Sequence, residues 1–121
     1  MFINNKLNTN IHYFKLYELK QNDYDHFVIT LSLLFKKKIN LKIIFDLSSL
    51  TVKDFLYSKQ FINFMKQNKN LTEKYIERTS IIIPNEFIRK NINFLIFNIY
   101  KPIKPNEITD TLENALNFLN K

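Results

Sequence analysis

The sequence LKIIFDLSSLTVKDF, which runs from Leu41 to Phe55, decides the fold expected for this chain. Its first half, residues 41–47, is a short and almost continuous apolar run, which is typical of a central strand buried on both faces. Thr51 then begins a helix, and Asp54 stands three residues later, where a capping-box partner is expected. A buried strand that leads directly into a capped helix is the repeating unit of α/β domains.

The chain before this stretch predicts a hairpin and a helix. Residues 2–7 and 11–19 have the composition of two strands around a turn. Asn22 or Asp23 is suited to cap a helix over 23–38 that ends in three lysines, which are favourable at the negative end of a helix dipole.

The chain after this stretch predicts two further strands and helices. A loop or extra turn around residues 68–78 leads to a strand over 79–83, and Pro84 suits the first turn of a helix over 85–100. A short strand follows around residues 106–109. Asp110 with Glu113 then predicts the cap of a terminal helix.

The resulting order is β-β-α-β-α-β-α-β-α over one domain, residues 1–121. The expected fold class is therefore α/β, with a mainly parallel or mixed sheet of about four to five strands and helices packed against it.

The composition limits the classes of function. The 18 Lys and Arg outnumber the 11 Asp and Glu and give a formal net charge of +7, which favours an anionic partner. The lack of Cys excludes disulfides and thiol chemistry. The first residues lack the pattern of a secretory leader, and the apolar stretches are shorter than the ~20 residues that cross a bilayer. A cytoplasmic protein without a transmembrane segment is expected.

The chain contains no Gly, which excludes glycine-rich phosphate loops and dinucleotide-binding fingerprints. Asn or Asp is expected to occupy the positions that need a positive φ. The abundance of residues with A/T-rich codons indicates genome bias, as in large DNA viruses, for which the compartment would be the host cytoplasm.

Acidic and hydroxyl side chains are expected at the carboxyl edge of the sheet, where parallel strands end and helices begin. They are Asp46, Ser48, Ser49, Thr51, Asp54, Asn85, Glu86 and Asp110. One interpretation is a divalent-cation site on Asp46 and Asp54. The other is a set of first-turn acids that face helix dipoles. The caps already explain these acids, so no metal and no cofactor is expected.

Basic side chains are expected at the opposite edge, and they form the candidate anion-binding site: Lys36, Lys37, Lys38, Arg78, Lys101 and Lys104, with Lys66 and Lys69 nearby. Such a patch binds anionic lipid or nucleic acid in a salt-dependent way. No aromatic residues alternate with these lysines as in nucleic-acid-binding motifs, which ranks nucleic acid behind lipid. The alternative is that the cations stay solvated at helix ends.

Two further groups of residues leave alternatives open. Phe87, Phe94 and Phe97 form a second apolar stripe on the helix over 85–100, which is a partner surface, a lipid-facing groove or, as is commoner, part of the core. His12 and His26 have no partners at ligand or triad spacing, so a structural role is expected for both.

The stretch that decides the fold resembles the core motif of STAS domains, the anti-sigma-factor-antagonist fold. The matching positions are Asp46, Leu47, Ser48, Leu50, Thr51 and Asp54. In phospho-switch members the residue after the second Asp is the phosphorylated serine, and here it is Phe55. The resemblance implies a protein partner bound near Asp46, Ser48, Ser49, Thr51, Asp54 and Phe55, without the phosphorylation switch at this position.

A second segment is similar to the late core of CRAL-TRIO lipid-binding domains. Glu73, Pro84, Phe87, Lys101 and Pro102 fall roughly in step with that family's turn, strand, proline, helix and Lys-Pro turn. The chain is much shorter than a complete lipid-transfer domain, and Lys74 stands where the family has Arg.

The sequence therefore predicts a non-enzymatic, STAS-like protein-interaction module. The alternative is a peripheral module of CRAL-TRIO-like type that binds lipid or an anionic membrane. A magnesium-dependent enzyme ranks last, because no base, nucleophile or phosphate loop accompanies the carboxylates.

Overall fold

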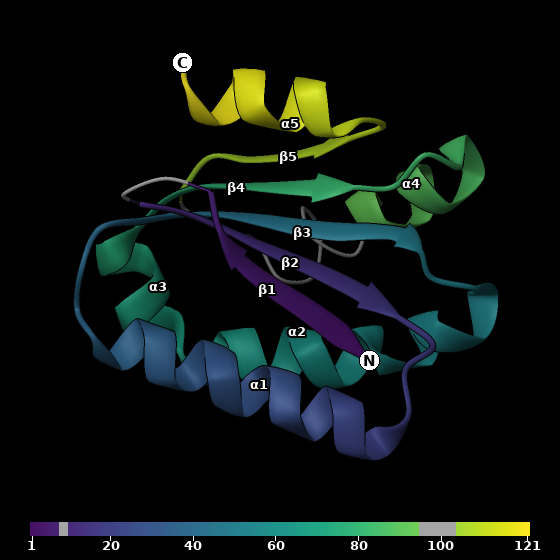
Figure 1. Ribbon diagram of the computed structural model, residues 1–121, viewed down its shortest axis with the longest axis horizontal. Helices are drawn as coiled ribbons and strands as arrows, with labels where there is room; N and C mark the ends of the chain where they lie inside the picture. The colour runs from purple at the N-terminus through teal and green to yellow at the C-terminus, as the bar shows by residue number, and fades with distance from the viewer. Residues whose placement is uncertain (8–9, 95–103) are drawn as a thin grey trace.

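The computed structural model describes residues 1–7, 10–94 and 104–121, and its fold is α/β (Figure 1). One sheet contains the strands β1 (Phe2–Lys6), β2 (Ile11–Tyr17), β3 (Leu41–Ser49), β4 (Ile76–Ile82) and β5 (Asn106–Thr109), in that spatial order. β1 is antiparallel to β2, whereas β2 to β5 are parallel to one another. The predicted mixed sheet is confirmed.

The helices connect the strands in chain order. They are α1 (Gln21–Lys36), the 3-10 helix η1 (Val52–Tyr57), α2 (Ser58–Gln67), α3 (Lys69–Tyr75), α4 (Glu86–Phe94) and α5 (Leu112–Leu119). Right-handed crossovers between strands that follow each other in both chain and space place their helices on one face of the sheet. Accordingly α1, α2 and α3 lie together on one face, and α5 lies on the other (Figure 1). These are called the α1 face and the α5 face below.

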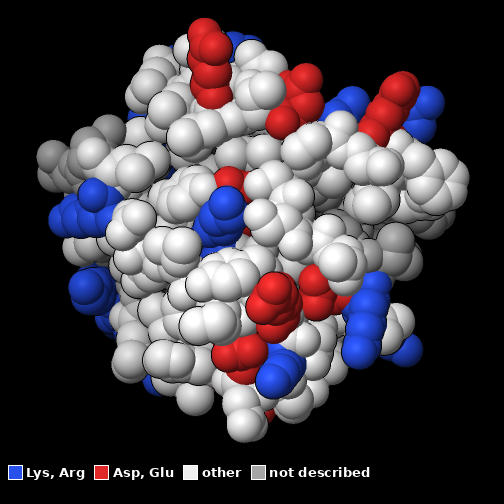
Figure 2. All heavy atoms as spheres, turned by 45° about the vertical axis from the view of Figure 1, so that its right-hand side comes forward, with Lys and Arg blue, Asp and Glu red and all other residues white. Residues whose placement is uncertain are grey.

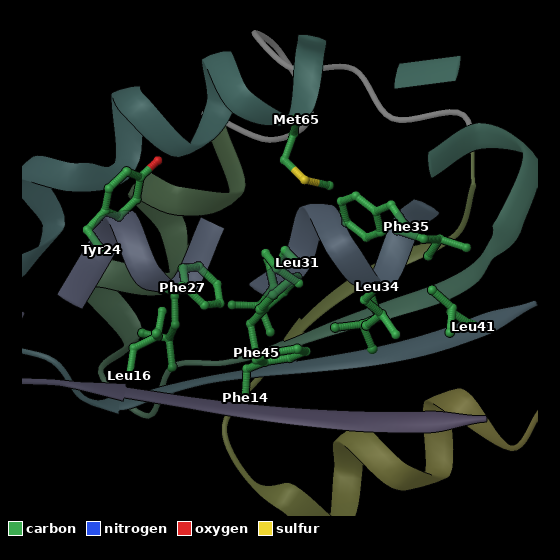
Figure 3. Packing of buried hydrophobic residues seen from close by; sticks show 14 residues of the cluster. Phe14, Leu16, Tyr24, Phe27, Leu31, Leu34, Phe35, Leu41, Phe45 and Met65 are labelled. Carbon is green, nitrogen blue, oxygen red and sulfur yellow. The ribbon is translucent and has the colours of Figure 1, made fainter. Parts of the chain in front are cut away.

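The main core lies on the α1 face. Alternate residues of the strands point to opposite faces, so Phe14 and Phe45 point toward Phe27 and Leu31 of α1 (Figure 3). Met65 of α2 points into the same layer (Figure 3). The smaller core on the α5 face consists of Ile11, Ile44, Ile82, Ala115 and Leu119.

The helix between β3 and β4 differs from the prediction of one continuous helix. It begins as the 3-10 helix η1, continues as α2, and is interrupted at Asn68, whose side-chain amide donates to the carbonyl oxygen of Phe64 at 2.9 Å. The segment expected to be a loop forms α3, and β4 follows at once from Ile76, three residues before the predicted start. Most residues of α3 are polar, so the sequence did not predict this helix, which tertiary packing stabilises.

The first residues of three helices also differ from the prediction. α1 begins at Gln21, so Asp23 is not its cap but accepts the backbone N–H of Lys20 at 3.1 Å from the first turn. α4 begins at Glu86, and Asn85 caps it through a 3.0 Å bond from the N–H of Ile88, which leaves Pro84 outside the helix.

The terminal helix α5 is capped one residue later than predicted. Thr111, not Asp110, accepts the N–H of Asn114 at 3.1 Å. Asp110 instead accepts the side-chain amide of Asn114 at 2.8 Å. That bond is the main reason why the pKa of Asp110 lies below its ordinary value.

The backbone positions with positive φ correct the expectation that Asn or Asp would occupy them. Within the described residues they are Glu18, with φ of 47°, and Lys38, with φ of 55°. Lys38 follows the last turn of α1, where a left-handed residue commonly ends a helix. The described part of the chain contains no helix that is long and apolar enough to cross a membrane.

Candidate functional site

A cavity of about 140 Å³ lies on the α1 face, between the sheet and the helices η1, α2 and α3. Aromatic side chains form much of its wall: Tyr24, Phe27, Phe45, Tyr57 and Phe61. Phe61 stacks on Phe27 with ring centroids 5.7 Å apart and meets Phe45 edge-on at 5.5 Å. These ring contacts stabilise the wall, which is almost entirely apolar.

Polar groups of the lining come from both ends of the strands. Asp54 and Ser58 follow β3 at the carboxyl edge, whereas Glu73 and Lys104 precede β4 and β5 at the opposite edge. Burial, followed by the nearby Asp25 carboxylate, raises the pKa of Tyr24 to about 12. Its hydroxyl is therefore neutral at pH 7.

Asp54 joins β2 to η1. One oxygen accepts the N–H of Leu19 at 3.1 Å, and the other accepts the N–H of Thr51 at 2.9 Å and its hydroxyl at 3.1 Å. The predicted pairing of Thr51 with Asp54 is confirmed. Since both oxygens already accept hydrogen bonds and the side chain is buried, Asp54 holds the loop that closes one end of the cavity.

Asp46 is buried on the α5 face and therefore points away from the cavity. It accepts the Tyr13 hydroxyl and, at 2.9 Å, the N–H of Ser48. Burial, helped by the bond to Asp46, raises the pKa of Tyr13 above its ordinary value. The sheet separates Asp46 from Asp54, so the structure does not bring the two predicted cation ligands together. Among the described residues, no group of three or more His, Cys, Asp and Glu is placed to hold a metal ion.

The carboxyl edge carries charges of both signs. Figure 2 brings this edge forward and shows acidic side chains with Lys and Arg beside them on a largely uncharged surface. Lys90 pairs with Glu86 at 3.4 Å, and the N-terminal ammonium pairs with Asp23 at 3.1 Å. Ser48, Ser49 and Thr51 are exposed here. The cations that pair with Glu86 and Asp23 at this edge were not part of the prediction.

The predicted phenylalanine stripe is described in part. Phe87 is 75% exposed at the start of α4, whereas Ile88 and Ile92 pack against the main core. The side chains of Phe55 and Phe94 and the whole of Phe97 lie outside the described residues. Sequence reasoning missed Leu56, which is 74% exposed on η1, at the same edge of the sheet.

The predicted basic edge is made by several elements. Lys36, Lys37 and Lys38 are exposed at the end of α1. Arg78 lies on the α5 face, with its guanidinium 5.1 Å from the centroid of the Phe118 ring. Lys104 lines the cavity, and Lys101 lies outside the described residues. The predicted anion site is thus divided between the two faces of the sheet.

His12 is buried at this basic edge, and within the part of the chain that the structure describes its Nε2 atom has no hydrogen-bond partner. Burial, with smaller contributions from the charges of Lys6 and Lys37, lowers the pKa of His12. His26 is exposed, and its ring meets the edge of Phe2 at 5.1 Å. Neither histidine lines the cavity.

Sequence reasoning missed the cavity because strands and helices far apart in the chain supply its wall. One local pattern could have helped. Tyr57, Phe61 and Phe64 recur at helical spacing and predict an aromatic stripe on α2.

No protein-family model, curated protein or solved structure matches the chain. The similarities to STAS and CRAL-TRIO domains remain predictions.

Proposed function

We propose that this chain is a non-enzymatic binding domain that takes a small amphipathic molecule into the cavity on its α1 face. The cavity carries the proposal. Its volume of about 140 Å³ is close to that of an engineered apolar cavity, on the order of 150 Å³, that stays dry and binds benzene. A ring or a short alkyl chain fits this volume, and a two-chain lipid does not.

The side chains around the cavity support binding rather than catalysis. Asp54 lies in the segment that follows β3, and both of its oxygens accept backbone or hydroxyl hydrogen bonds. A general base needs a free lone pair within reach of the substrate, and Asp54 does not offer one. The other carboxylate of the lining, Glu73, forms an ion pair with Lys69 at 3.6 Å, and no described residue of the lining is a histidine.

This proposal keeps one part of the lipid-binding alternative, namely that an apolar group enters between the sheet and the helices, as expected of a CRAL-TRIO-like core. It differs in the size of the ligand, which is a small molecule and not a two-chain lipid. The order of strands and helices also agrees with the STAS-like prediction, so a STAS-like core with an internal ligand site remains part of the proposal.

Uptake of toluene tests the proposed function. Titration of the isotope-labelled protein, followed by two-dimensional NMR, is expected to shift the signals of residues on α2 and β3 and to saturate. Ile62→Trp, which places a larger side chain in the cavity wall, is expected to abolish the shifts. Ile29→Trp, on the exposed side of α1, is the matched control. Equal shifts in both variants would contradict the proposal.

A second candidate function is binding of a protein partner through the carboxyl edge. Leu56 and Phe87 favour it, because their apolar side chains are 74% and 75% exposed and follow the adjacent strands β3 and β4. Exposed aromatic and aliphatic side chains on one edge are frequent anchors of protein interfaces.

The test compares two double variants in an affinity capture. Leu56→Ser with Phe87→Ser is expected to lose a partner that the unmodified protein retains. Ile29→Ser with Leu33→Ser removes comparable exposed apolar surface from α1 and is expected to retain it. Loss of the partner in both double variants would contradict a specific role for the carboxyl edge.

A further inference from the structure

Among the described residues, one carboxylate oxygen at the cavity has no hydrogen-bond donor. It is Oε1 of Glu73, which is inaccessible to solvent although the side chain as a whole is 30% exposed, and Glu73 lines the cavity. Oε1 forms an ion pair with the ammonium of Lys69 at 3.6 Å, which is beyond hydrogen-bonding distance. A buried acceptor that lacks a donor is costly, and the cost is largest for a charged group.

The neighbouring polar groups are directed elsewhere. The Thr72 hydroxyl donates to the carbonyl oxygen of Lys69 at 3.1 Å. The side-chain amide of Asn106 donates to the carbonyl oxygen of Lys104 at 2.8 Å. These two donors thus bind backbone, and among the described residues Oε1 of Glu73 has only its ion pair with Lys69, at the end of an apolar wall.

We infer that Glu73 recognises the polar end of the ligand, and that this end is a hydrogen-bond donor, an alcohol or a protonated amine. This inference rests on the proposed function, because it assigns the polar end of a molecule whose apolar part occupies the cavity. The donor would satisfy Oε1, whereas a ligand carboxylate would be repelled by it. Lys104 also lines the cavity. If its ammonium recognised the polar end instead, a ligand carboxylate would bind best.

Four ligands with the same ring separate these choices: toluene, benzyl alcohol, benzylamine and benzoate. NMR titrations at pH 7 are expected to show that the alcohol or the amine binds at least tenfold more tightly than toluene, and that benzoate binds most weakly. A tenfold change is about 1.4 kcal/mol, which lies near the lower limit for a hydrogen bond to a charged group.

Two variants assign the preference to Glu73. Glu73→Leu is expected to bind toluene as before and to bind the alcohol and the amine no more tightly than toluene. Glu73→Gln keeps an acceptor without the charge, so it is expected to retain the preference for the alcohol and to lose that for the amine.

The outcomes for the two proposals are distinct. Binding of toluene without any preference for the donors, or tightest binding of benzoate, would overturn the role of Glu73 and leave the cavity as a binding site. Failure of all four ligands to bind would overturn the proposed function itself. Unchanged preferences in Glu73→Leu would also overturn the inference.

Discussion

Two buried aspartates, Asp46 in β3 and Asp54 in η1, stabilise the fold at positions where a metal site was one interpretation of the sequence. Asp46 and Asp54 stand eight positions apart in the sequence, on opposite faces of the sheet. Each oxygen of Asp54 accepts from the loop around it, and Asp46 holds Tyr13 and the N–H of Ser48. The spacing that resembles a STAS motif is explained by these internal bonds.

Asp54→Ala is expected to lower the free energy of unfolding by about 2 kcal/mol, because the N–H groups of Leu19 and Thr51 lose the acceptor of their part-buried hydrogen bonds. Asp54→Asn is expected to cost less, since it keeps one oxygen. Urea denaturation measures both. Asp25→Ala, which removes an exposed carboxylate, is the control and should change stability by less than about 0.5 kcal/mol.

His12 is expected to make the protein less stable in mild acid. Its pKa in the folded state lies below the ordinary value of 6.5, so the unfolded state binds the proton first. The stabilisation from neutral His12 is complete above pH 6.5, the ordinary value, and is lost as the pH falls through 6.5 toward the pKa of the folded state. His12→Leu should therefore weaken the loss of stability between pH 7 and pH 5, measured by urea denaturation at each pH. An unchanged pH dependence would show that other groups cause it.

At the scale of elements, the end of α1 shows the cost of a chain without glycine. Lys38 adopts a φ of 55°, which only glycine adopts without a steric penalty. The backbone N–H of Lys38 donates to the carbonyl oxygen of Phe35 at 3.2 Å, so this conformation terminates the helix.

Lys38→Gly is expected to raise the free energy of unfolding by about 1 kcal/mol, because it relieves the left-handed conformation. Lys37→Gly is the matched control. Lys37 has a right-handed φ of −67°, so glycine there should lower stability. Thermal denaturation of the two variants measures the difference, and a fall in stability for both would contradict the explanation.

Strands were easier to predict from the sequence than helix boundaries. The apolar run over 41–47 predicts β3 because a strand buried on both faces needs no polar alternation. The starts of α1, α4 and α5 were misplaced by one or two residues, since several polar residues in a row can each act as a cap. α3 was missed because its seven residues are mostly polar and depend on packing against β4.

At the scale of the whole molecule, the order of the strands determines where the cavity lies. The strands β2 to β5 follow one another in space as in sequence, so their crossovers cover the α1 face with helices. α5 follows the last strand and covers part of the other face (Figure 1). The cavity lies within the thicker of these two layers.

The sheet and its helices could therefore be predicted, but the cavity could not. The charged residues predicted sites at the two edges of the sheet. The cavity instead lies beside one face of the sheet, and its wall combines Phe27, Phe45 and Phe61 from three separate elements. Whether a cavity remains depends on how side chains from all of these elements pack together, and no local sequence pattern shows this. The sequence around Glu73 predicted a loop or an extra turn, and only the position of its Oε1 atom, inaccessible to solvent at the cavity, distinguishes this residue.

Xenon binding in a crystal of the unmodified protein tests the cavity most directly, because apolar cavities of this volume take up xenon. A xenon atom is expected among Phe27, Phe45 and Phe61 when crystals are exposed to the pressurised gas. Crystals with no xenon at this place, or with side chains filling it, would show that this domain has no internal apolar binding site.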